Sequence, residues 1–319
     1  MFHVSRRDLV VGAAGAFAAF GLDKPLAFIG AAQAQTIPAG PGFKKYQVGD
    51  IEVISLYDGV WEKPHDEKFI KGATVDETKA ALTAGGLPDA FVSIPFTVLA
   101  LKSAGRLMLI DAGTGGQAGG PKAGLLAQSM AAAGLDPKDV KTILVSHFHG
   151  DHVFGLMAKD TNAPIFPDAE IVVPAAELKW WTQPLESIPE GRRPNAQRVQ
   201  ATLQNWKNVK AVDGEADVAP GVRIVPAHGH TQGHAIYLIS SGGKQLMVTC
   251  DVTIIYSLFA RHPDWQIMFD HVPDEAVATR RKVFDRAIAD KAMVAGYHWG
   301  LPNVGTIAKD GNGYAFVAA

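Results

Sequence analysis

Three histidines and an aspartate occur within six residues, in the order His147, His149, Asp151 and His152. They follow a short apolar run that is typical of a buried strand. Imidazole and carboxylate groups are the ligands that bind zinc and similar divalent metals at neutral pH. On an extended chain, alternation places His147, His149 and Asp151 on one side. A turn at Gly150 would carry Asp151 and His152 to a second point, so one short segment can supply two adjacent metal sites.

Further candidate ligands follow three other apolar runs downstream. One run leads into a glycine-containing turn with several histidines, and the other two end directly at a candidate ligand. In chain order these candidates are His228, His230, His234, Asp251 and His298. Strand ends and the loops after them are where α/β architectures place their chemistry. The spacing therefore predicts that residues distant in the sequence meet at one edge of a sheet.

The chain resembles the metallo-β-lactamase superfamily of binuclear metallohydrolases. The resemblance rests on His147-x-His149-x-Asp151-His152, on the segment Gly229–His234, on Asp251 and on His298. The upstream Asp111-Ala112-Gly113 is similar to the family's Asp-Thr-Gly strand end, with alanine in place of threonine. The similarity covers about residues 45 to 305. It is greatest to the branch of methyl parathion hydrolases and secreted lactonases.

The resemblance implies two metal sites that share one carboxylate. Their ligands would be His147, His149 and His230 for the first metal, Asp151, His152 and His298 for the second, and Asp251 between them. Asp111 and His234 are expected to lie behind the ligands and to support them through hydrogen bonds or packing. His228 is expected at the rim of the site or on the surface. The implied cofactors are two divalent metal ions, zinc first, with manganese, cobalt and iron as alternatives.

The function implied is two-metal hydrolysis of a small uncharged lactone or aryl ester, with organophosphate triesters as a further substrate class. A bridging hydroxide would attack the substrate, and Asp151 would both ligate and transfer a proton. Ile254 stands three residues after Asp251, where homoserine-lactone lactonases carry a tyrosine, and Tyr256 is out of register. Two alternatives stay open, a β-lactamase and a mononuclear iron protein of the persulfide dioxygenase type. Asp251 stands where the best-known zinc β-lactamases place a ligand cysteine, which disfavours a β-lactamase. Persulfide dioxygenases lack the full second site, whereas Asp151, His152 and His298 are all present here, which disfavours the iron protein.

Aromatic residues near these motifs are candidates for a substrate pocket. Trp180 and Trp181 are adjacent on a predicted helix, so their side chains point about 100° apart. One is expected in the core and the other in the pocket wall. Phe96 and Phe154 are further pocket candidates, although core packing is the favoured interpretation for both. The pair Arg192-Arg193 is expected to be solvated.

The composition is that of a globular protein without nucleic-acid affinity. The chain has 319 residues, 47% of them hydrophobic, enough for a large single-domain core. Its formal charge of −2 lacks the basic excess that a nucleic-acid partner requires. Cys250 is the only cysteine, so no intrachain disulfide can form, and a buried, inert thiol is expected. A homodimer is expected from the resemblance alone.

The N-terminus has the pattern of a cleaved twin-arginine signal peptide, residues 1–34. Arg6-Arg7 precedes an apolar stretch, and Ala32-Gln33-Ala34 is a small-residue cleavage site. Asp23-Lys24 interrupts the apolar run before the roughly 20 residues that a membrane span needs, so no stable anchor is expected after cleavage. Residues 35–319 would form one hydrolase domain, periplasmic or secreted.

The pattern of apolar residues predicts two runs of strands, each followed by a helix. This order indicates an α/β fold, a four-layer αβ/βα sandwich, as the resemblance also implies. Strands are expected at 43–56 with a turn at 49–50, at 91–102 and at 106–111. Helices are expected at 76–84, 122–133, 174–181, 197–205 and 273–289, with an irregular stretch at 184–194.

Overall fold

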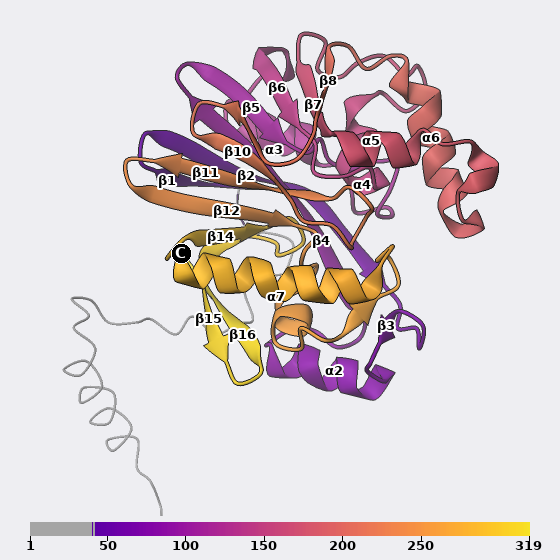
Figure 1. Cartoon of the computed structure of the whole chain (residues 1–319), viewed down its shortest axis with the longest axis vertical. Helices are drawn as coiled ribbons and strands as arrows, with labels where there is room; N and C mark the ends of the chain where they lie inside the picture. The colour runs from indigo at the N-terminus through magenta and orange to yellow at the C-terminus, as the bar shows by residue number, and fades with distance from the viewer. Residues whose placement is uncertain (1–39, 41) are drawn as a thin grey trace, which may run out of the picture. The chain divides into compact units, whose positions relative to one another are not determined.

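Two seven-stranded sheets form the centre of the computed structural model, which describes residue 40 and residues 42–319 (Figure 1). The first sheet has the order β1-β2-β4-β5-β6-β7-β8, and the second has the order β16-β15-β14-β12-β11-β10-β9. The predicted signal peptide, residues 1–34, lies outside the described residues. Among the described helices, none has both the length and the apolar character needed to cross a bilayer.

The strands of the first sheet are β1 (Phe43–Val48), β2 (Ile51–Lys63), β4 (Val92–Ser103), β5 (Arg106–Ile110), β6 (Val140–Leu144), β7 (Glu170–Pro174) and β8 (Val209–Val212). Those of the second are β9 (Ala216–Ala219), β10 (Val222–Pro226), β11 (Ala235–Ser241), β12 (Lys244–Cys250), β14 (Met293–Gly296), β15 (Val304–Asp310) and β16 (Gly313–Ala318). A separate short pair joins β3 (Ile70–Lys71) to β13 (Gln266–Ile267).

Alternation along the strands divides the core into layers. In β4, Val98 and Ala100 pack into one buried cluster, whereas Leu99 and Leu101 pack into another. The second cluster also contains inward residues of the second sheet such as Tyr237, so it lies between the two sheets. The outer faces are covered by α3 and α6 on the first sheet and by α7 on the second. This is the predicted four-layer αβ/βα sandwich.

The helices are α2 (Val75–Ala84), α3 (Leu126–Ala132), α4 (Gly150–Val153), α5 (Ala175–Trp181), α6 (Arg193–Leu203) and α7 (Pro273–Ala289). The prediction for α7 is confirmed at both ends. Helix α3 begins four residues later than expected. Asp58 holds the segment that leads into α3. Its backbone oxygen accepts from the N–H groups of Gly124 and Leu125, and its carboxylate accepts from the N–H of Leu126. Helix α6 begins four residues earlier than expected, so the stretch 184–194 is not irregular but contains two 3₁₀ turns and the start of α6.

Parallel pairing gathers the strand ends that carry the candidate ligands. Strand β5 runs parallel to β6, and β12 runs parallel to β14. The carboxyl ends of parallel neighbours lie at the same edge of a sheet. Residues after these four strands therefore meet where the two sheets lie face to face.

A buried arginine on α7 fixes the segment that follows β12. Arg280 is 2% exposed, and its guanidinium donates to the backbone oxygens of Val252, Pro263 and Trp265 at 2.8–2.9 Å. Sequence analysis did not identify this residue, because arginine on an apolar helix face carries no local signal. It ties the chain after Asp251 to the outer helix.

We expect Arg280→Met to lower the free energy of unfolding by about 3 kcal/mol, because three buried carbonyls lose a charged donor. The neighbouring Arg281→Met is the matched control, since Arg281 pairs with Asp264 at the surface. Such an exposed pair contributes about 0–1 kcal/mol. Urea denaturation at one fixed metal concentration measures both variants, and equal losses would contradict the structural role of Arg280.

Candidate metal centre

The histidine-rich motif follows β6 and bends at Gly150, as the sequence predicts. His147 and His149 lie on the extended chain after the strand, and Gly150 begins the short helix α4, which carries Asp151 and His152. The remaining candidates come from the other sheet. His230 lies between β10 and β11, Asp251 directly follows β12, and His298 follows β14.

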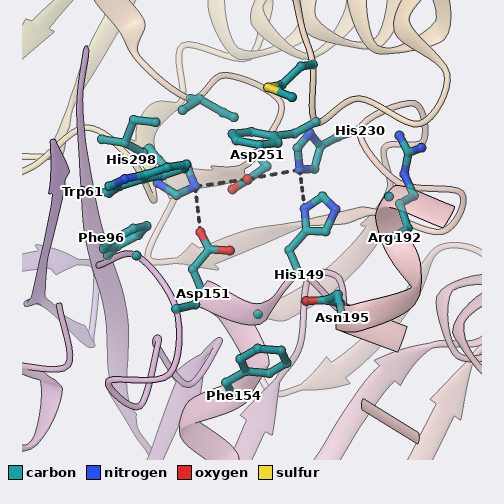
Figure 2. Close-up of a pocket in the computed structure, with 18 of the residues that line it drawn as sticks. Trp61, Phe96, His149, Asp151, Phe154, Arg192, Asn195, His230, Asp251 and His298 are labelled. Carbon is teal, nitrogen blue, oxygen red and sulfur yellow. Dashed lines mark hydrogen bonds and ion pairs between the residues drawn. The ribbon is translucent and has the colours of Figure 1, made fainter. Parts of the chain in front are cut away.

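Four of these residues, His147, His149, His230 and Asp251, form a first group around one point. Figure 2 labels His149, His230 and Asp251 of this group. The Nδ1 atom of His149 lies 3.0 Å from Nε2 of His147 and 3.0 Å from Nε2 of His230. Oδ2 of Asp251 lies 3.2 Å from Nε2 of His230 and 3.8 Å from Nε2 of His147. Three ring nitrogens and a carboxylate oxygen thus face one another.

A second group adjoins the first through the same aspartate. Asp151, His152 and His298 bring their ligand atoms together, with Oδ2 of Asp151 3.5 Å from Nε2 of each histidine. Oδ1 of Asp251 lies 3.2 Å from Nε2 of His152, and Oδ2 lies 3.1 Å from Nε2 of His298. The carboxylate of Asp251 therefore contacts both groups.

Partners behind the ligands determine which ring nitrogen faces inward. The Nδ1 atom of His152 bonds to Oδ2 of Asp111 at 2.7 Å, and Nδ1 of His230 bonds to Oδ1 of Asp270 at 2.9 Å. The Nδ1 atom of His298 likewise bonds to a backbone oxygen at 2.9 Å. Since a neutral imidazole carries one N–H, donation from Nδ1 leaves Nε2 with a lone pair. Asp111 lies where the sequence predicted it, whereas sequence analysis missed Asp270.

Unpaired buried atoms test whether the residues fit metal ions. Nε2 of His152 and Oδ1 of Asp251 are fully enclosed, and within the described part of the chain neither has a hydrogen-bond partner. Buried polar atoms left unpaired are costly, and two facing lone pairs repel each other. A cation between them removes both penalties, so nitrogen and oxygen donors of this kind fit two divalent metals such as zinc.

The electrostatics of the centre also call for positive charge. Burial disfavours the charged form of His230, but Asp251 and Asp270 outweigh it and raise the pKa of His230 to about 9. For His147, burial prevails and holds the pKa well below its usual value. Burial opposes ionisation of Asp251 too, yet the surrounding imidazoles hold its pKa well below the usual range. A metal that binds here must displace the proton on His230.

His234 supports the centre from behind. Its Nδ1 atom donates to the backbone oxygen of Ala227, and its Nε2 atom accepts from the backbone N–H of Asp251 at 3.1 Å. Burial lowers the pKa of His234 to about 3, so the ring stays neutral and keeps this acceptor. His228 is half-buried and lies outside the metal groups, on the wall of a separate groove.

Glu177 joins the two loops that carry the first ligand group, and sequence analysis missed it. This fully buried carboxylate on α5 accepts from four donors, which are the backbone N–H groups of Phe148 and Gly233, the hydroxyl of Thr231 and the indole of Trp181. Gly233 packs so closely that an added Cβ would lie 2.0 Å from the backbone nitrogen of Glu177. The glutamate therefore fixes the distance between the His147–His149 loop and the His230 loop.

A cavity of about 420 Å³ opens above the two ligand groups (Figure 2). Of the predicted pocket residues, Phe96, Phe154 and Trp181 line it. Phe96 and Trp181 are also buried in the core, so each of them both packs in the core and lines the cavity. Trp180 does not line the cavity and packs on His271 with ring centroids 4.5 Å apart. Of the two tryptophans, Trp181 is therefore the one in the cavity wall.

Several lining residues come from segments without a chemical motif. They are Trp61, Ile94, Ile254, Met268, Phe269, Arg192 and Asn195. The expectation that Arg192 is solvated is wrong, because its guanidinium is half-buried in the cavity wall and donates to the backbone oxygen of Asp270. No local pattern distinguishes these residues from ordinary core or surface positions.

Comparison with known proteins agrees with this geometry. The profile of the metallo-beta-lactamase superfamily matches residues 94–298. An N-acyl homoserine lactonase of Bacillus sp is 32% identical over 108 residues, covering 34% of this chain and 36% of that protein, so the match spans about a third of the relative. The crystal structure of AidC, a dizinc quorum-quenching lactonase in complex with its product, has a TM-score of 0.81 at 27% identity. It covers 87% of this chain and 97% of that one.

The hydrolase AbOPH, described as a member of the beta lactamase superfamily, has a TM-score of 0.80 at 24% identity. The match covers 88% of this chain and 99% of that one. At 24% identity, this similarity shows that the two proteins share a fold.

We expect Glu177→Gln to weaken the first metal's affinity by about 10- to 100-fold, the usual effect of changing a partner behind the ligands. The second metal should be affected less, because Glu177 bonds to this segment at Phe148, before the bend at Gly150 that leads to His152, and none of its four hydrogen bonds reaches the loop that carries His298. Competition with a chromophoric chelator resolves the two binding steps. Glu190→Gln, an exposed change nearby, is the control, and unchanged binding in Glu177→Gln would refute the positioning role.

Proposed function

The chain belongs to the metallo-β-lactamase superfamily, and from this premise we propose that it is a dinuclear metal-dependent hydrolase of lactones and aryl esters. One observation carries the proposal. Two groups of buried, convergent nitrogen and oxygen lone pairs share the Asp251 carboxylate at the floor of a largely aromatic cavity. Such a cavity suits a small uncharged ester better than a charged substrate.

The ligand roles follow the two groups. His147, His149 and His230 would hold one metal, Asp151, His152 and His298 the other, and Asp251 would contact both. Two divalent cations held by these residues would supply Lewis-acid chemistry, polarising an ester carbonyl and lowering the pKa of a water.

Asp151 is the residue best placed to move a proton. Its side chain is 22% exposed, whereas that of Asp251 is 3% exposed, so Asp151 is the ligand carboxylate open to the cavity. We infer that it accepts the proton of the attacking water and returns it to the leaving oxygen. The tyrosine expected in homoserine-lactone lactonases three residues after Asp251 is replaced by Ile254, which lines the cavity, and Tyr256 packs against Trp299 instead.

Organophosphate triesters are proposed as secondary substrates. Like lactones, they are uncharged and undergo attack at a polarised centre, so the same cavity can accept them. We also propose that the mature enzyme acts in the periplasm or outside the cell.

Asp251→Ala should lower hydrolysis by at least about a thousandfold, which corresponds to roughly 4 kcal/mol of transition-state stabilisation. Both metals lose a ligand, so metal content should fall below the two ions per chain expected for the wild type. Elemental analysis and turnover are measured together on a homoserine lactone, an aromatic lactone, an aryl ester, a phosphotriester and a penicillin. His228→Ala, outside the metal groups, is the control.

Full turnover in Asp251→Ala would refute the assignment of the centre. One iron per chain in the wild type, without hydrolysis of any substrate in the panel, would instead favour the persulfide dioxygenase alternative. Turnover of the penicillin far above the other compounds would favour a β-lactamase.

Replacing Arg6 and Arg7 by lysine should retain the full-length protein in the cytoplasm, because twin-arginine export depends on this pair. Immunoblots of cytoplasmic and periplasmic fractions measure the distribution. Unchanged export of the double variant would contradict the proposed route.

A further inference from the structure

One buried tyrosine contacts all three candidate ligands of the second metal group. Tyr297 is 1% exposed and directly follows β14, in a turn that also contains His298. Its ring stacks on that of His152, with centroids 4.0 Å apart, and its hydroxyl donates to the backbone oxygen of Asp151 at 2.6 Å. The rings of Tyr297 and His298 lie 4.9 Å apart. The second group is therefore gathered around one side chain.

The turn after β14 brings Tyr297 and His298 to the same side of the chain. Consecutive residues on an extended strand point to opposite faces. Here both rings contact His152, that of His298 with centroids 5.6 Å apart. The turn can be this tight because residue 296 is a glycine, where an added Cβ would lie 2.1 Å from the ring of Trp299. The indole N–H of Trp299 donates to a backbone oxygen after β12 at 2.9 Å, which fixes the turn.

The hydroxyl of Tyr297 bonds to a backbone oxygen that α4 leaves without its usual partner. In a continuing α-helix the oxygen of Asp151 would accept from the N–H of Gly155, four residues later. That N–H donates instead to the backbone oxygen of Gly113 at 3.0 Å. Carbonyls at the end of a helix need a partner from elsewhere. The phenol supplies it, and so fixes the backbone of a residue whose carboxylate is a candidate ligand.

The ring of Tyr297 fixes the plane of the His152 imidazole. Asp111 bonds to Nδ1 of His152 at 2.7 Å, which decides which nitrogen faces inward. One hydrogen bond still lets the ring tilt, and the stacked phenol, inclined by 29°, limits that tilt. Nε2 of His152 is thereby kept 3.5 Å from Oδ2 of Asp151 and 3.2 Å from Oδ1 of Asp251.

We propose that Tyr297 is the positioning residue of the second metal site, because it holds the three ligands of that site in place relative to one another. The phenol acts through the ligands, since it is buried and is not among the residues that line the cavity. Its role at the second group parallels that of Glu177 at the first. The proposal rests on the two-metal centre of the proposed function and not on the identity of the substrate.

A second buried tyrosine offers a matched control. Tyr237 is fully buried, and its hydroxyl donates to the backbone oxygen of Val145 at 2.8 Å. Like Tyr297, it joins the second sheet to the first through one bond from a phenol to a carbonyl. Val145 precedes the ligand motif, and the Tyr237 ring packs in the apolar layer between the sheets. Tyr237→Phe therefore reports the general cost of losing such a bond.

Zinc titration against a chromophoric chelator tests the assignment without any substrate. His298→Ala removes a ligand of the second site, so the binding step that it weakens most identifies that site. Tyr297→Phe should weaken the same step by about 10- to 100-fold, the usual effect of changing a partner behind a ligand, and leave the other step nearly unchanged. Tyr237→Phe should leave both steps nearly unchanged.

Two further measurements separate the hydroxyl from the ring and from general stability. Tyr297→Leu loses the stacking on His152 as well as the hydrogen bond, so it should weaken the second step more than Tyr297→Phe does. Urea unfolding of the metal-free proteins should give similar losses for the two phenylalanine variants, because each loses one buried bond between the sheets.

Equal weakening of both steps by Tyr297→Phe, or no weakening beyond that of Tyr237→Phe, would overturn the proposal. The tyrosine would then only join the sheets. Weakening confined to the other step would overturn it as well. A wild-type protein that binds fewer than two zinc ions per chain would contradict both this assignment and the two-metal centre. One that binds two zinc ions but hydrolyses no ester would refute the proposed function and leave the assignment of Tyr297 intact.

Discussion

Five imidazole rings surround the carboxylate of Asp251 in a space almost closed to solvent. Once any proton on them is displaced, the inner nitrogens of His152, His230 and His298 carry lone pairs, because their outer nitrogens are bonded to oxygen acceptors. Lone pairs gathered in this way repel one another unless positive charge lies between them. Further buried carboxylates lie behind the candidate ligands and hold them in place. Asp111 and Asp270 bond to ligand rings, and Glu177 bonds to the loops that carry the first group.

Some of the hydrogen bonds that join the two sheets lie beside the centre. The hydroxyl of Tyr297 donates to the backbone oxygen of Asp151, and that of Tyr237 donates to the backbone oxygen of Val145. Glu177 adds a third link between the loops of the two sheets. The apolar layer between the sheets and these bonds together hold the candidate ligands from opposite sheets at their distances.

The cavity has two distinct parts. The candidate metal ligands form its floor, and nitrogen and oxygen donors of this kind suit divalent metals. Its walls come from other segments, including Trp61 on β2 and Phe96 on β4. The walls are not independent of the floor, because Phe96 packs on His298 with ring centroids 5.5 Å apart and the Trp181 indole donates to Glu177. A change in the wall can therefore also shift a candidate ligand.

The sequence by itself determined the candidate ligand set, the layered fold and the long helix α7, because each depends on a local pattern. Ligand spacing at strand ends, period-two alternation and an amphipathic helix face are all visible within a few residues. Glu177, Asp270 and Arg280 could not be identified, since a buried charged residue is recognised only by the distant groups that it bonds. The same holds for the pocket walls: Trp181 rather than Trp180 faces the cavity because of how α5 packs, and only tertiary structure decides that.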